Sequence, residues 1–172
     1  MTVHFKIVDR HSACLHYVEP LMALTEQIKQ ANGFPLLYPP NEELFIRRLD
    51  TNRHKIFTYD NQRLIGFSIL EYLDQWPEYL SHLDYPPEQS AVLLITLLHP
   101  DHRRLGISKK MTEIRVNAAK TEGINYLFST VHPDNIASIK NLQSQGMQMI
   151  EQRLMFEEQL LRNLMFLDLT GK

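Results

Sequence analysis

The chain has few of the residues that cross-link or anchor a protein. Its one cysteine, Cys14, permits no disulfide within the chain and no thiolate-based zinc site. It has no apolar run long enough to cross a bilayer and no signal-peptide core near Met1. The formal net charge of -2 offers nucleic acid and acidic membranes no general attraction. We therefore expect a cytoplasmic protein that needs no metal and binds neither nucleic acid nor membrane.

The remaining composition is that of an ordinary globular domain. The chain has 172 residues, of which 44% are hydrophobic and 22% are charged. A chain of this length can bury a core without disulfides or metals. We expect residues 1–172 to form a single domain.

Hydrophobic periodicity predicts strands and helices in alternation, which makes a mixed α/β (α+β) sheet. The tail is ambiguous: residues 149–156 and 161–169 read as two strands, but residues 156–166 also fit an amphipathic helix. The other expected strands are 3–8, 54–59, 63–73, 91–99 and 126–132, and the expected helices begin near Pro20, after Asn41, after Gly106 and at Asn135.

The strongest candidate for a ligand site is a basic turn between an apolar run and a helix. Residues 91–99 are almost continuously apolar, as in a strand that is buried on both faces. Pro100 ends that run, and Arg103, Arg104 and Gly106 then precede a helix. The first amides of a helix and its positive end attract phosphate, and glycine lets the ligand approach closely. The turn therefore predicts an anion site, although an ordinary connection with solvated arginines is the simpler alternative.

A second segment pairs with this turn. It runs from Val131 to Ser138 and contains His132-Pro133-Asp134-Asn135, with Gly146-Met147 following. Together with Pro100-x-x-Arg103-Arg104-Leu105-Gly106-Ile107-Ser108, it resembles the two motifs of the GNAT acetyltransferase superfamily. A truncated P-loop is the other phosphate motif, but Ile107 follows Gly106 where that motif needs lysine.

The resemblance implies a GNAT-like fold: a mostly antiparallel, twisted sheet of about seven strands with about four flanking helices and splayed central strands. It also implies that acetyl-coenzyme A is the cofactor, with its pantetheine arm on the strand and its pyrophosphate on the turn. The residues implied to bind it are Thr96, Leu97, Leu98, Arg103, Arg104, Leu105, Gly106, Ile107, Ser108, Lys109, Asn135 and Ser138.

The proton-handling residues are not identified. Where many members of the superfamily carry a tyrosine and several carry a glutamate, this sequence has Leu142 and Thr130. His132 and His99 end the two central strands, and an unperturbed imidazole pKa of about 6.5 suits proton transfer. Two alternatives stay open: that these histidines only cap main-chain groups, or that alignment and water suffice. Other candidates are Tyr38, Glu71, Tyr72 and Tyr85.

The sequence gives only indirect evidence about the molecule that would accept the acetyl group. Residues 71–90 contain five acids and no lysine or arginine, which would suit a cationic amine or simply a solvated loop. The apolar Phe34–Pro40 loop suggests a partly hydrophobic pocket. We expect an N-acetyltransferase that acts on a primary amine of a small molecule or peptide by direct attack on the thioester. The alternative is a non-catalytic acyl-coenzyme A sensor, and the sequence leaves a homodimer open.

Overall fold

The computed structural model describes residues 1–31, 36 and 40–171. Its seven strands hydrogen-bond in the order β1-β2-β3-β4-β5-β7-β6. The β4–β5 pair is parallel, and the sheet is mostly antiparallel, as expected. The strands are β1 (Val3–Val8), β2 (Arg53–Asp60), β3 (Arg63–Tyr72), β4 (Ser90–Leu98), β5 (Tyr126–Val131), β6 (Gln148–Met155) and β7 (Leu160–Asp168). The α-helices are α1 (Val18–Gln30), α2 (Glu42–Arg48), α3 (Ile107–Thr121) and α4 (Ile136–Ser144).

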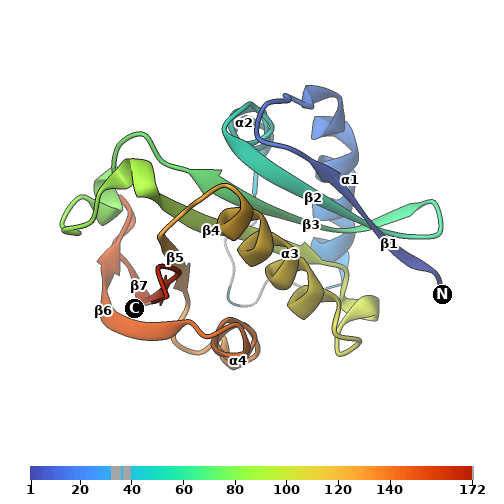
Figure 1. The fold of residues 1–172 in the computed structure, drawn as a ribbon. Helices are drawn as coiled ribbons and strands as arrows, with labels where there is room; N and C mark the ends of the chain where they lie inside the picture. Colours follow the sequence, from blue (N-terminus) through green and yellow to red (C-terminus); the bar gives the residue numbers. More distant parts are fainter. Residues whose placement is uncertain (32–35, 37–39, 172) are drawn as a thin grey trace. The chain divides into compact units, whose positions relative to one another are not determined.

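The chain forms two compact units. The first comprises Met1–Ile69 and Ile95–Met111, and the second comprises Leu70–Leu94 and Thr112–Lys172. Strands β3 and β4 and helix α3 each supply residues to both units. Figure 1 labels the helices and strands.

In the first unit, aromatic rings join the helices to the sheet. The ring of Tyr17, in the short 3-10 helix Leu15–Tyr17 before α1, stacks on Phe57 of β2 with centroids 3.9 Å apart. Phe45 of α2 meets Phe67 of β3 edge-on at 6.1 Å. Strand β2 also pairs with β1 in an antiparallel register that begins at Val3 and Asp60. The rings of Tyr17 and Phe45 thus cover Phe57 of β2 and Phe67 of β3.

The first unit also buries a cation, Lys55. Its side chain is completely buried, and Nζ donates hydrogen bonds to the main-chain carbonyls of Asp9, Ser12 and Asp50. Burial lowers the pKa of Lys55 because water no longer stabilises its charge. The three carbonyls replace that water and tie β2 to the two loops that supply them.

In the second unit, successive residues of β5 and β7 face two separate cores. Leu127 and Met165 pack with Val116 of α3 and Leu142 of α4. Their neighbours along the strands, Phe128 and Leu164, belong to a second cluster with Leu73, Leu80 and Val92. This alternation is what a strand buried on both faces requires, and it confirms the expected buried strand at 126–132.

The acidic insertion between β3 and β4 is anchored by its aromatic residues. Tyr85 packs on Tyr126, Phe128 and Phe166, and the indole nitrogen of Trp76 donates to the Tyr85 carbonyl at 2.9 Å. These rings form part of the second cluster. Two single-turn 3-10 helices, Glu78–Leu80 and Pro87–Gln89, complete the segment.

The structure resolves the ambiguity in the tail. Residues 148–155 and 160–168 are strands β6 and β7, joined by a turn in which Phe156 and Gln159 have positive φ angles of 67° and 53°. The hairpin interpretation is therefore confirmed, and a helix over 156–166 is excluded. Helix α2 follows Asn41 as expected, and Asn41 caps it by accepting a hydrogen bond from the Leu44 amide at 2.8 Å. Most of the Phe34–Pro40 loop lies outside the described residues.

Candidate functional site

The centre of β4 is irregular. Ile95 has a φ angle of +24°, which a β-branched residue rarely adopts. Beyond it, Leu97 and Leu98 are buried and Thr96 is half-buried. Next to this segment, a Cβ on Gly66 would lie 3.0 Å from the Leu97 carbonyl oxygen, so only glycine fits there without a shift. The part of β4 implied to hold the pantetheine thus departs from regular strand geometry.

Two left-handed residues shape the basic turn that follows. A single-turn 3-10 helix, Pro100–His102, comes first; then Arg104 has a φ angle of +63° and Gly106 one of +76°. A Cβ on Gly106 would meet no atom within 4 Å. The space beside Gly106 is therefore open to a ligand, and glycine is favoured there by backbone conformation as well.

The helix start after this turn is suited to an anion. The Lys110 amide donates to the Gly106 carbonyl at 3.0 Å and closes the first turn of α3. That turn contains no acidic residue, while Arg103, Arg104 and Lys109 are exposed around it. Helix N-terminal amides, the positive helix end and three cations all attract phosphate oxygens. These residues fit a pyrophosphate.

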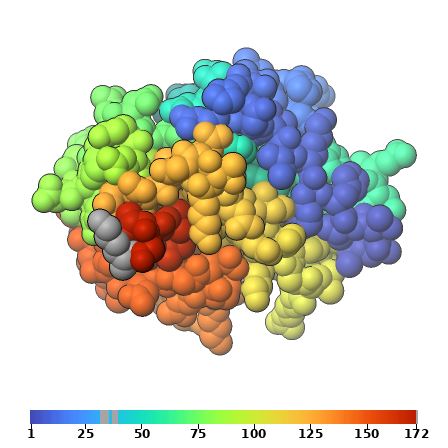
Figure 2. All heavy atoms as spheres, viewed as in Figure 1, coloured from blue at the N-terminus to red at the C-terminus, as the bar shows by residue number. Residues whose placement is uncertain are grey.

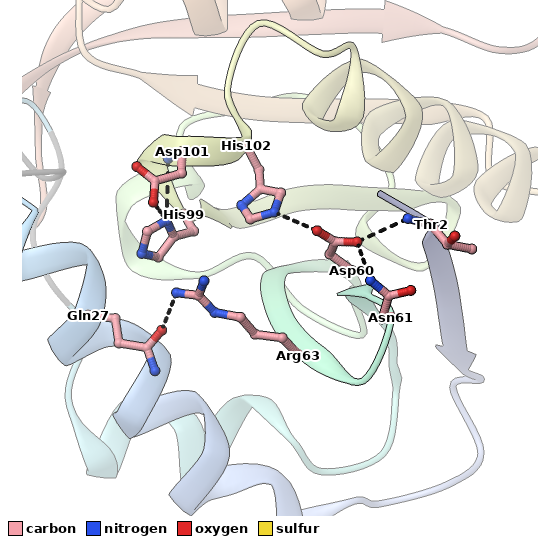
Figure 3. Close-up of polar contacts among 8 residues, drawn as sticks. All are labelled: Thr2, Gln27, Asp60, Asn61, Arg63, His99, Asp101 and His102. Atoms are coloured by element: carbon pink, nitrogen blue, oxygen red, sulfur yellow. Dashed lines mark hydrogen bonds and ion pairs between the residues drawn. The ribbon is translucent and has the colours of Figure 1, made fainter.

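His102 anchors the start of the turn. Its Nε2 lies 3.1 Å from Oδ2 of Asp60, and Asp60 also accepts from the Thr2 amide and the Asn61 side chain (Figure 3). The hydrogen bond from His102 lowers the pKa of Asp60. His102 is buried, and its other ring nitrogen, Nδ1, has no partner among the described residues. The sequence did not single out this pair, because 42 residues separate its members.

The two candidate bases make the same local contact. Nδ1 of His132 accepts a hydrogen bond from the Asp134 amide at 3.0 Å. Nδ1 of His99 accepts one from the Asp101 amide at 3.3 Å, as Figure 3 shows. Burial lowers the pKa of His99, and the nearby Arg63 lowers it further. A neutral imidazole that accepts through Nδ1 carries its proton on Nε2, so a second proton could be taken up only by breaking this bond.

In the second unit, Asn135 caps α4. Its side-chain oxygen accepts from the Ser138 amide at 3.2 Å, and both residues are half-buried. Asn135 thus caps α4 through its side-chain oxygen, at the position where the sequence predicted a helix to begin. Leu142, at the superfamily's tyrosine position, lies in the core beside Met147 and supplies no proton. The turn at 103–109 belongs to the first unit, and Asn135, Ser138 and His132 belong to the second.

A buried cation beside β4 was not predicted. Arg115 of α3 is only 2% exposed; Nη1 donates to the Leu94 carbonyl at 2.8 Å, and Nη2 donates to Oγ1 of Thr112 at 3.2 Å. The same Oγ1 accepts from Asn141 of α4 at 3.0 Å. The sequence could have predicted this burial from spacing, because Arg115 lies four residues from both Met111 and Ala119, on the apolar face of α3.

Residues 1–31, 36 and 40–171 contain no cluster of three or more histidine, cysteine, aspartate or glutamate side chains able to hold a metal ion. None of the helices in these ranges is long and apolar enough to span a membrane.

An irregular strand, an acid-free helix start and a basic turn, carried on a mixed seven-stranded sheet, define a protein built to hold a phosphorylated cofactor. Residues 21–147 match the acetyltransferase (GNAT) family, and the chain belongs to that family. The family uses acetyl-coenzyme A, and the protein is an N-acetyltransferase enzyme. No curated protein matches the chain in sequence.

Solved structures share the fold at low sequence identity. The ribosomal-protein-S18-alanine N-acetyltransferase of Escherichia coli has a TM-score of 0.72 at 15% identity, covering 98% of this chain and 96% of that one. The yncA protein of Salmonella typhimurium, solved with its cofactor acetyl-coenzyme A, has a TM-score of 0.70 at 15% identity, with 100% and 96% coverage. An IAA acetyltransferase from Bacillus cereus has a TM-score of 0.62 at 12% identity, with 98% and 100% coverage. These similarities show the fold, whereas the named acceptors belong to those proteins.

Proposed function

We propose that the protein transfers the acetyl group of acetyl-coenzyme A to a primary amine of a small molecule or peptide. The observation that carries this proposal is the turn before α3, where Arg104 and Gly106 are left-handed, the space beside Gly106 is open and the first helical turn has no acid. Family membership supplies the reaction class. The cytoplasm is the proposed compartment, since a reducing environment suits the lone, buried thiol of Cys14.

The proposed cofactor contacts follow from the two motifs. Main-chain groups of Thr96, Leu97 and Leu98 would hold the pantetheine arm. The amides from Arg104 to Lys109, together with the Arg103 side chain, would hold the pyrophosphate. Asn135 and Ser138 would contact the cofactor arm. When bound, acetyl-coenzyme A supplies a thioester carbonyl that an amine can attack directly.

The protein's own contribution is chiefly alignment. Holding an amine against a bound thioester replaces a bimolecular encounter, which can account for most of the acceleration. An ammonium group must lose a proton before its nitrogen can form the new C–N bond; the thioester C–S bond then breaks, and coenzyme A would leave as a thiolate that takes a proton from water. Because Nδ1 of His132 and of His99 already accepts a main-chain hydrogen bond, we propose that water takes the ammonium proton and that both histidines serve as caps.

A cationic amine is the proposed acceptor class. Four of the five acids between residues 71 and 90 are exposed in the second unit, and Trp76 and Tyr85 are engaged in packing. The exposed carboxylates create a negative local potential that would attract a polyamine, an aminoglycoside-like compound or a basic peptide end. The four exposed acids are Asp74, Glu78, Asp84 and Glu88.

An acceptor screen tests the proposal. Release of free coenzyme A thiol from acetyl-coenzyme A is followed with polyamines, aminoglycosides and peptides with free N-termini, and with neutral amines for comparison. Turnover on cationic amines, falling as salt screens the charges, is the expected result. Tight cofactor binding without turnover on any amine would instead favour the acyl-coenzyme A sensor, consistent with the buried Leu142.

A further inference from the structure

Strand β6 is an edge strand with an unusual surface. It ends the strand order next to β7, and its first seven residues are exposed or half-buried. Met149, Ile150 and Leu154 are 55%, 45% and 54% exposed, and Leu161, which pairs with Leu154, is 43% exposed. The orange part of the surface in Figure 2 contains α4 and β6. An edge strand with apolar side chains and without lysine or proline is suited to pairing with another strand.

The sequence of β6 is complementary to itself. When two copies of a strand pair antiparallel about Gln152, Glu151 of each copy lies opposite Arg153 of the other. Ile150 of each copy then lies opposite Leu154 of the other. Opposite charges and paired aliphatic side chains at directly facing positions stabilise antiparallel strands. The ladder with β7 is irregular between Met149 and Glu151, where Ile150 lies, and regular from Glu151 onward. The two Glu151–Arg153 pairs about Gln152 therefore lie in regular strand, and the Ile150–Leu154 pairs lie at its margin.

Glu151 and Arg153 lie on the same face of β6. Nη1 of Arg153 is 3.8 Å from Oε1 of Glu151, and the two side chains are 42% and 31% exposed. Both are therefore accessible to a facing strand. Strand β1, at the other end of the strand order, contains Lys6 and no carboxylate, so pairing with itself could form no such ion pair.

We propose that the protein is a homodimer in which β6 pairs antiparallel with β6 of a second copy about a two-fold axis at Gln152. The two sheets become continuous through this pairing. Two Glu151–Arg153 pairs flank the axis, and the exposed aliphatic residues meet across it. This inference rests on the edge strand alone, and it is independent of which amine the enzyme acetylates.

Charge reversal tests the register. Sedimentation velocity over the micromolar range is expected to show a dimer for the wild type. Glu151→Arg places arginine opposite arginine, Arg153→Glu places glutamate opposite glutamate, and each single variant is expected to dissociate. The double variant Glu151→Arg/Arg153→Glu restores both pairs and is expected to dimerise again. A monomeric wild type, or a double variant that stays monomeric, overturns the proposal.

Two controls separate the interface from general charge and folding effects. Glu158→Arg makes the same charge change in the turn after β6 and should leave the dimer intact. His82→Gln alters the contact between His82 and Glu151 within the chain and should also preserve dimerisation. Circular dichroism checks that every variant is folded. Dissociation of either control would count against the proposed register.

A cross-link gives an independent readout. Gln152→Cys would face its own copy across the axis, at the Cα separation of about 4.5–5.5 Å that directly opposed residues have and that a disulfide accepts. Copper–phenanthroline oxidation is therefore expected to give a covalent dimer. Gln148→Cys, displaced along the strand, should not cross-link, and the native Cys14 is only 2% exposed. Equal cross-linking of the two variants would refute the register.

Discussion

The guanidinium of Arg115 donates from Nη1 to the main-chain carbonyl of Leu94 at 2.8 Å, immediately before the left-handed residue Ile95. Burial lowers the pKa of Arg115 to about 9, so it remains charged at neutral pH. A carbonyl that turns out of a strand ladder needs another donor when it is buried. Arg115 provides that donor and, through Thr112, is connected to Asn141 of α4.

Replacing Arg115 with methionine should therefore destabilise the protein. Arg115→Met keeps an unbranched apolar stem but leaves the Leu94 carbonyl without this donor, and we expect a loss of about 3 kcal/mol in the free energy of unfolding. Urea denaturation measures it. Arg47→Met, the same change at an exposed side chain of α2, should cost within about 0.5 kcal/mol. Equal effects at the two positions would contradict the role assigned to Arg115.

The basic turn can be tested with two glycines in the same conformation. Gly106 and Gly123 have φ angles of +76° and +75°, and a Cβ on either would meet no atom within 4 Å. Changing either to alanine should cost about 1–2 kcal/mol of stability because of its left-handed backbone. Only Gly106→Ala should also weaken coenzyme A binding, by about tenfold or more, or 1.4 kcal/mol. Calorimetric titration that finds equal affinities for the two variants would rule out the assigned pyrophosphate site.

If His132 and His99 only cap main-chain amides, replacing them should have little effect on turnover. His132→Asn retains a side-chain oxygen that can accept from the Asp134 amide but cannot act as a base near neutral pH. If His132 is only a cap, kcat should stay within about tenfold of wild type, whereas loss of a general base would lower it by about 10²–10⁴-fold. His99→Asn is the parallel variant at the other strand end. A kcat loss in the larger range for either variant, at saturating substrates, would identify a base.

Lys55 predicts a second stability effect. Lys55→Met preserves the aliphatic stem and removes the three hydrogen bonds to the carbonyls of Asp9, Ser12 and Asp50. We expect the free energy of unfolding to fall by about 3 kcal/mol, because these acceptors lose a charged donor. Lys140→Met, at an exposed position on α4, serves as the control and should have little effect. Denaturation curves that coincide for the two variants would be inconsistent with a structural role for Lys55.

Acid should destabilise the first unit through Asp60 and His99. The hydrogen bond from His102 lowers the pKa of Asp60, and burial lowers the pKa of His99. Each group therefore binds fewer protons when folded than when unfolded, so stability falls as pH falls. The His99 contribution is complete above about pH 6.5 and is lost below it, as pH falls through the folded pKa.

The Asp60 contribution is present above about pH 3.9 and is lost at lower pH, as the folded carboxylate becomes protonated. Denaturation at a series of pH values measures both. His99→Gln should flatten the decline just below pH 6.5, and Asp60→Asn should flatten only the more acidic part. Slopes unchanged from wild type would disprove these assignments.

Much of the architecture is encoded in local patterns. The apolar pattern of residues 126–132, the helix start after Asn41 and the end of the apolar run at Pro100 each depend on a few neighbouring residues, so they predicted β5, α2 and the end of β4. The resemblance of residues 100–108 and 131–138 to the two motifs of the superfamily indicated the family and implied its cofactor. The helix-or-strand ambiguity at 156–166 remained because short apolar stretches fit both periods.

The sequence by itself determined the order of elements, the family and the candidate cofactor residues, since those depend on near neighbours along the chain. Only the tertiary structure decided that Lys55 and Arg115 are buried, that Asp60 holds His102, and that Glu151 and Arg153 lie on an edge strand. Each of these depends on residues that are distant in sequence and become neighbours only after folding. The sequence alone does not show whether a charged residue will be buried or exposed in the folded protein.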